Sequence, residues 1–203
     1  MNTTKKLTIA VVALALSLVL VVGGTVAFLV ATSGPVTNTF TYGDINIELK
    51  EHKYVNGAII TTEEVTANNT YKVIPGDTEE KDPFVRVTSG SEKCYVYVTV
   101  QNSVKLDDGT IVASVNISST DWLVVATKGD TTLYRYKEVV DASTEAKTLQ
   151  VFTAVTYDAE KILKTNIAQV NNDTITVVAY AYQEANVSQD AADTAVKELA
   201  GLN

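Results

Sequence analysis

The chain has few of the residues from which catalytic and metal centres are built. Its 203 residues include one histidine, His52, and one cysteine, Cys94. A Ser-His-Asp or Cys-His nucleophilic site would have to use His52, which lies in a charged stretch beside a hairpin and is predicted to be solvated. One histidine cannot form the two-histidine zinc motif of many metalloproteases, and one cysteine excludes a cysteine-rich zinc site. The sequence therefore predicts a protein that is not an enzyme, with no cofactor and no metal.

A single cysteine also leaves the chain without an internal disulfide. Cys94 stands in an alternating run, which places it on one strand face with Val96, Val98 and Val100, while Tyr95, Tyr97 and Thr99 share the other face. We expect Cys94 to be a small core residue. The alternative is a surface thiol that links two chains.

Charge is missing from most of the N-terminal region. After Lys5 and Lys6 the next charged residue is Asp44. A short basic segment followed by an apolar run is the pattern of a secretory signal, so the sequence predicts export. The apolar stretch from residue 7 to residue 31 has 25 residues. Because roughly 20 apolar residues span a bilayer, an uncleaved membrane anchor is the alternative.

Small residues mark the expected end of this signal. Thr25 and Ala27 stand at the −3 and −1 positions of an A-x-A-like site, so we expect residues 1–27 to be a signal peptide and Phe28 to be the first residue after cleavage. Because the signal holds two lysines and no acid, its removal changes the formal net charge from −8 to −10. Such acidity argues against nucleic acid or an anionic membrane surface as a partner.

The rest of the chain consists mostly of short runs rich in Val, Ile, Thr and Tyr, separated by turn signals, which is typical of an all-β domain. Asn56-Gly57 predicts a two-residue hairpin, and Asp108-Gly109 and Gly129-Asp130 predict similar turns. Ten strands exceed what one open twisted sheet usually holds, so we expect a jelly-roll-type two-sheet β-sandwich. The predicted strands are 37–50, 53–60, 70–74, 83–88, 93–102, 111–117, 121–127, 131–140, 148–157 and 173–184.

One or two short helices and an N-terminal hydrophobic signal helix complete the predicted fold. A helix is expected near the C-terminus, capped by Ser188 and ended by Gly201, and a shorter one over 158–168. The densest acidic run, 77–82, lacks the spacing of a known calcium loop, which favours a solvated acidic turn over a calcium site.

The order of several motifs resembles the TasA/camelysin family of secreted proteins from Gram-positive bacteria. The motifs are GGTVAF at 23–28, NTFTYGDI at 38–45, IPGDTEEKDP at 74–83, SEKCYVYV at 91–98 and ITVVAYAYQ at 175–183. Each motif is short, and only the ordered set carries the resemblance. The chain departs from the family where 28–31 stays apolar and where 195–197 lacks a tryptophan.

The resemblance implies a jelly-roll subunit of extracellular fibres in biofilm matrix, joined by donor-strand exchange. The implied partners are other copies of the chain, head to tail, a signal peptidase during export, and accessory matrix proteins. The implied location is secreted and associated with the cell surface. Part of the family is also classed as metallopeptidase, which the scarcity of metal ligands in this chain disfavours.

A free N-terminal segment fits the fibre interpretation. Residues 28–40 are largely apolar or β-branched and carry no charge. Laid along an exposed sheet edge of the next subunit, this donor strand would satisfy its backbone and bury side chains there. Pro35 would mark a bend or hinge. The β-sandwich domain would then span 41–203. The expected donor side chains are Phe28, Val30, Val36 and Phe40.

Three alternatives remain open from the sequence. The segment 28–40 can instead fold back as an edge strand of its own domain. The chain can be a monomeric cell-surface adhesin or ligand-binding module that contacts a partner through loops such as 75–82 and 104–110. It can also be a camelysin-like secreted metallopeptidase.

Overall fold

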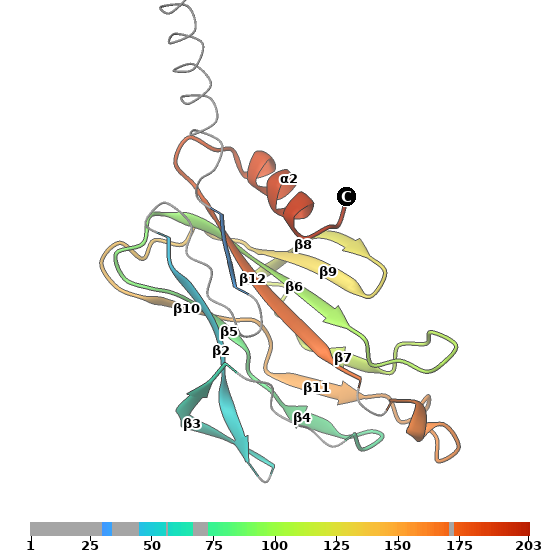
Figure 1. Ribbon diagram of the computed structural model, residues 1–203. Coiled ribbons are helices and arrows are strands. Elements are labelled where there is room, and N and C mark those ends of the chain that lie inside the picture. Colours follow the sequence, from blue (N-terminus) through green and yellow to red (C-terminus); the bar gives the residue numbers. More distant parts are fainter. Residues whose placement is uncertain (1–29, 34–44, 56, 67–72, 171–172) are drawn as a thin grey trace, which may run out of the picture.

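The computed structural model describes residues 30–33, 45–55, 57–66, 73–170 and 173–203. These residues form three antiparallel sheets and one α-helix, an arrangement consistent with an all-β sandwich (Figure 1). The five-stranded sheet has the order β1 (Val30–Ser33), β12 (Ile175–Gln183), β6 (Cys94–Asn102), β9 (Thr131–Tyr136), β8 (Trp122–Lys128). The four-stranded sheet has the order β10 (Lys147–Gln150), β5 (Phe84–Val87), β2 (Ile47–Val55), β3 (Ala58–Val65). The third sheet has the order β4 (Thr78–Glu80), β11 (Ala154–Tyr157), β7 (Ala113–Val115).

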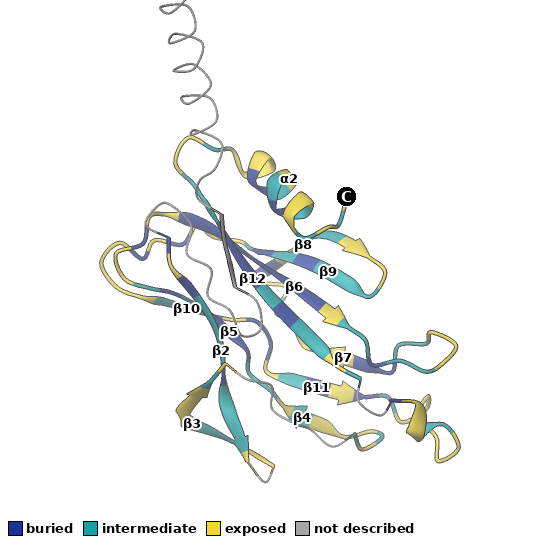
Figure 2. Cartoon of the chain, viewed as in Figure 1, coloured by how far each residue is buried: buried dark blue, intermediate teal, exposed yellow. Residues whose placement is uncertain are grey.

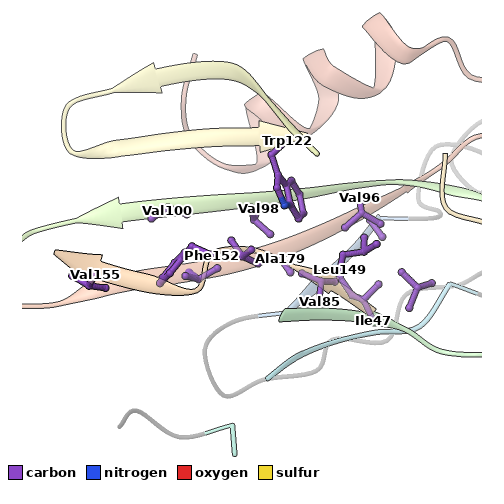
Figure 3. Close-up of a cluster of buried hydrophobic side chains, with 14 of the residues drawn as sticks. Ile47, Val85, Val96, Val98, Val100, Trp122, Leu149, Phe152, Val155 and Ala179 are labelled. Carbon is purple, nitrogen blue, oxygen red and sulfur yellow. The ribbon is translucent and has the colours of Figure 1, made fainter. Parts of the chain in front are cut away.

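The main core lies between the five-stranded and four-stranded sheets. Figure 3 shows Val96, Val98 and Val100 of β6 together with Val85 and Leu149 of the four-stranded sheet. Branched side chains at alternate positions of facing strands fill such an interface without polar atoms. The core therefore joins the two larger sheets into one unit.

Strand β6 is buried on both faces. Cys94 and the valines face the main core, while Tyr95 and Tyr97 belong to a second cluster beneath the C-terminal helix. The predicted division of this strand into two faces is confirmed. Cys94 is fully buried, as predicted, and burial raises the pKa of its thiol to about 12.

Helix α2 (Gln189–Leu199) covers the outer face of the five-stranded sheet (Figures 1 and 2). The Ser188 hydroxyl accepts a hydrogen bond from the Ala191 amide, and Gly201 follows the helix at φ +69°. Ala192 and Val196, one turn apart, are its buried residues. The prediction of this helix is confirmed. The predicted helix over 158–168 is wrong, because the chain there forms turns that lead into a 3-10 helix, η1 (Ile167–Val170).

One predicted strand is two strands. Residues 148–157 divide into β10 and β11, which belong to different sheets. Between them Val151 and Phe152 are both buried, since the chain passes through the core as it crosses from one sheet to the next. No glycine or proline marks this break.

Several expectations concern residues outside the described ranges. These are the signal peptide 1–27 with its cleavage point between Ala27 and Phe28, the donor side chains Val36 and Phe40, and much of the predicted strands 37–50 and 70–74. Val30 begins β1. Within the described ranges, no helix combines the length and the apolar character needed to cross a membrane.

Candidate assembly site

Strand β1 lies antiparallel along β12. Val30 is opposite Tyr182 and Ser33 is opposite Ala179, so the four residues of β1 cover about half of the nine-residue β12. The other edge of β12 pairs with β6 over its whole length. Strand β12 is therefore interior to the sheet only where β1 covers it.

The β12 residues beneath β1 are closely packed. Ala179 and Ala181 face the main core and are fully buried, while Tyr180 belongs to the cluster under α2. Both faces of this part of β12 are thus filled by the rest of the chain, and β1 covers its remaining edge. A backbone edge with both faces already supported is a ready template for an added strand.

Strand β1 also contacts β2, the nearest strand of the four-stranded sheet (Figure 1). It therefore closes one side of the sandwich, which we call the β1 side (β1 and the facing β2). Gly34 and Pro35 follow β1 directly in the sequence. Because proline has no amide hydrogen to donate to a ladder, it suits the end of an edge strand.

The opposite side of the sandwich is closed by a side chain. Trp122, at the start of β8, donates its indole N–H to the carbonyl of Gln150 at 2.8 Å, which links β8 to β10 of the other sheet. Its ring meets Tyr136 edge-on with centroids 5.3 Å apart, and it is 2% exposed. The Gln150 amide in turn donates to the carbonyls of Pro83 and Phe152. We call this the Trp122 side (β8 and β10).

His52 is not the solvated residue that the sequence suggested. Its Nδ1 lies 2.6 Å from Oδ2 of Asp82, and its backbone amide donates to Oδ1 of the same carboxylate at 3.1 Å. The ring also packs on Phe84 with centroids 5.3 Å apart. The prediction of a solvated histidine is wrong, because Asp82, 30 positions along the chain, is brought beside β2 by the fold. The pair braces β2 against the segment that leads into β5.

The acidic run 77–82 is partly built into the fold. Part of it forms β4, and Tyr54 donates its hydroxyl to Glu79, a bond that raises the tyrosine pKa to about 12. Lys81 donates to Glu51 at 2.7 Å, and both side chains are largely buried. In the described part of the chain, no three His, Cys, Asp or Glu residues gather as metal ligands would. Asp77 and Glu80 are exposed, as predicted for a solvated acidic turn, whereas Glu79 and Asp82 brace β2.

A buried polar group holds α2 to the sheet. Arg135 of β9 forms an ion pair with Asp193 of α2, and Tyr97 of β6 donates its hydroxyl to the same carboxylate at 2.8 Å. Burial, followed by the neighbouring Asp193, raises the pKa of Tyr97. Because Tyr97 and Arg135 are both buried, loss of the Asp193 carboxylate would leave them poorly satisfied. The helix is thus fixed over the face that carries β12, and β12 is held from both sides.

A scan against protein-family models gives no match, and neither do searches for similar curated proteins or similar solved structures. The family resemblance therefore depends on the ordered motifs alone, and the function has to be argued from the geometry of the strands. Sequence reasoning marked the segment around β1 but missed the Trp122 contact. The signal available for it was the only tryptophan of the chain standing at the head of an apolar run.

Proposed function

We propose that the chain is a secreted structural subunit of extracellular fibres and that it assembles by passing its N-terminal strand to the next copy. The observation that carries the proposal is the pairing of β1 with β12. The strand is four residues long, stands at a sheet edge, and covers a β12 edge that is supported on both faces. The same strand from a neighbouring copy can occupy the same place with the same register.

Residues 34–44 join β1 to the sandwich in the sequence. Eleven residues, 34–44, separate Ser33 from Ile45, and a fully extended chain of this length reaches about 40 Å. Exchange between copies keeps every β1–β12 hydrogen bond, so its free energy is set by the linker and by the chain entropy. Small changes in linker strain therefore shift the balance between a closed monomer and a fibre.

The finer features of the proposal follow the motifs. Residues 1–27 are a signal peptide cleaved between Ala27 and Phe28, and the remaining chain is a jelly-roll-type sandwich in the biofilm matrix of a Gram-positive bacterium. Its partners are further copies of itself, a signal peptidase during export and accessory matrix proteins. Donor side chains are Phe28, Val30, Val36 and Phe40.

Negative-stain electron microscopy tests the role directly. Residues 28–203 and a version that starts at Thr41 are incubated at equal concentration. Fibres from the longer version alone support strand exchange. If neither version forms fibres, the structural role is wrong and a monomeric binding module becomes the better proposal. Fibres from both keep the structural role but place the contacts elsewhere.

A mixed cysteine experiment separates exchange from closure within one chain. Ala31 and Ala181 are opposite each other in the β1–β12 ladder. One preparation carries Ala31→Cys and the other carries Ala181→Cys, so a disulfide between them can form only across two chains. The matched control pairs Ala31→Cys with Ala154→Cys on β11, which lies in a different sheet. All preparations also carry Cys94→Ala, so that the native thiol cannot contribute.

A further inference from the structure

The part of β12 that β1 covers alternates small and large residues. Ala179 and Ala181 are fully buried in the main core, while Tyr180 is in the cluster beneath α2 and Tyr182 packs against that cluster. The preceding core-facing residue of β12, Val177, is larger and lies beyond the end of β1. The alanines of the core face therefore stand where β1 covers the strand.

The strands at this edge come close to the opposite sheet (Figure 1). Cα atoms of β1 lie within 8 Å of Cα atoms of β2, and the same is true of β12. Sheets that face each other usually pack ~10 Å apart. Because Ala179 and Ala181 have no exposed surface in spite of their small side chains, the space between the sheets is already filled there. A strand at this edge therefore has room only for small residues on its core face.

The register of β1 matches this alternation. Residues that face each other in a ladder share a face of the sheet. In β1, a small residue stands opposite each alanine of β12, and a β-branched residue stands opposite each tyrosine. Pairs of aromatic and β-branched residues are among those that stabilise adjacent strands. The four pairs are Val30–Tyr182, Ala31–Ala181, Thr32–Tyr180 and Ser33–Ala179.

We propose that residues 179–182 of β12 select the donor strand by the size of its residues. A matching strand has small residues opposite the two alanines and β-branched residues opposite the two tyrosines. A slip of one residue in either direction would place Thr32 opposite an alanine, so the same size matching also fixes the register. That the donor comes from a second copy rests on the proposed function, whereas the size matching applies equally to a strand of the same chain.

The size pattern that fits β12 is rare in this chain. A matching strand needs a β-branched residue, a small residue (Ala, Gly or Ser), a second β-branched residue and a second small residue, in that order. Among the 203 residues only 30–33, with the sequence VATS, have this order. The N-terminal strand is therefore the one segment of the chain that matches the edge of β12, and β12 of one copy distinguishes β1 of another copy from its other strands.

Two valine substitutions test the size matching in the intact chain, expressed with its own N-terminal segment. Ala31→Val puts a β-branched residue opposite Ala181, whereas the matched control, Thr32→Val, exchanges one β-branched residue for another opposite Tyr180. Hydrogen exchange at the amides of 179–182 reports whether a strand covers this edge. Exchange should be faster by about tenfold or more in Ala31→Val and should stay within about twofold of the unaltered chain in Thr32→Val. Equal effects of the two substitutions would overturn the proposal.

A second pair of substitutions repeats the test at the ends of β1. Ser33→Val puts a β-branched residue opposite Ala179, and Val30→Ile keeps one opposite Tyr182 as the matched control. The amide of Val98 in β6 serves as the reference in all four variants, so that exchange under β1 is measured relative to exchange in the core. A Ser33→Val chain that exchanges no faster than Val30→Ile at 179–182 would contradict the size matching.

Electron microscopy of the same variants separates the size matching from the proposed function. Fibres from the unaltered chain and from Thr32→Val, but not from Ala31→Val, would support both. Fibres from all three, with equal hydrogen exchange, would leave the structural role standing and overturn the size matching. If no variant forms fibres but hydrogen exchange still separates Ala31→Val from Thr32→Val, the fibre role is wrong and the size matching holds for a β1 that closes its own chain.

Discussion

The two sides of the sandwich are closed in different ways. On the Trp122 side, one large buried side chain crosses from β8 to a carbonyl of β10, and its ring packs on Tyr136. On the β1 side, a strand of four residues lies along β12 and contacts β2. The first closure depends on a side chain fixed in the middle of the sequence. The second depends on a short strand from the start of the chain.

Under the proposed strand exchange, the β1 side is the one that would open. Loss of the Trp122 side chain would leave a large cavity in the core. Loss of β1 would instead expose the backbone edge of β12, which a similar strand can cover. A subunit that exchanges a strand needs one weak and replaceable closure together with one permanent closure. The molecule has both, at opposite edges of the same pair of sheets.

The largest expected effect comes from breaking the permanent closure. Trp122→Ala removes the ring from a site that is 2% exposed and leaves the Gln150 carbonyl without its donor. We expect a loss of about 3–5 kcal/mol in the free energy of unfolding, measured by denaturant titration. Val124→Ala, at an exposed position of the same strand, is the control and should change little. A loss below about 1 kcal/mol for Trp122→Ala would show that β8 and β10 are held together by other contacts.

A smaller effect is expected on the β1 side. Alternate amides of a strand point to opposite sides, so one of Ala31 and Thr32 donates to β12 and the other points away. Proline at the donating position should cost about 1 kcal/mol and proline at the other position less, because proline lacks the donor. Hydrogen exchange at the β12 amides of 179–182 gives the readout. If these amides exchange equally slowly in both variants and in the unaltered chain, the backbone hydrogen bonds of β1 do not hold it to β12.

Acid should weaken the ion pairs that link β2, β3 and β5 in the four-stranded sheet. Glu64 of β3 accepts from Arg86 at 2.9 Å and from Lys50 at 3.2 Å, and these contacts lower its pKa from 4.5 to about 2. A carboxyl with a lowered pKa stabilises the folded state above pH 4.5, and this contribution is lost as the pH falls towards 2. Because Glu64 is about one-third exposed, the effect should stay below about 1 kcal/mol. Denaturant titrations of Glu64→Gln should show a flatter dependence over this pH range.

The last prediction concerns the native thiol of Cys94 and needs no change to the chain. Cys94 lies in β6, between the two closures, and burial raises its thiol pKa to about 12. A thiol reagent at pH 8 should therefore label it only when the chain unfolds. An added cysteine at Leu123 should react at once and serves as the control. Fast labelling of Cys94 in the unaltered chain would show that the sandwich opens locally.

Much of the fold follows from local patterns in the sequence. Strict alternation identified 93–102, which the structure has as β6 (Cys94–Asn102). The Asn56-Gly57 pair correctly predicted the turn between β2 and β3, where Gly57 has φ +87°. Capping residues similarly identified α2. Each of these signals lies within a few residues of the structure that it specifies.

The features that the sequence did not reveal depend on distant partners. The break between β10 and β11 has no turn residue, because burial of Phe152 and not a local preference bends the chain. His52 is held by a contact with Asp82, and Trp122 by a hydrogen bond to the Gln150 carbonyl. In both cases the partner is distant in the sequence. At the candidate assembly site, the segment 28–40 was recognised from its composition, and its fold-back as an edge strand of its own domain was the alternative, which β1 matches. Its place beside β12 was not predicted, because a short apolar strand fits many edges and only the full fold shows which one it covers.

The pairing of β1 with β12 also sets the order in which the chain can mature. Val30 and Tyr182 are opposite each other although 152 positions separate them (182 − 30). At about 5–20 residues per second, synthesis takes roughly 8 to 30 s to bring β12 out after β1. Until β12 is complete, β1 has no partner within its own chain. In the proposed assembly, β1 of such an incomplete chain could pair only with the β12 of another copy.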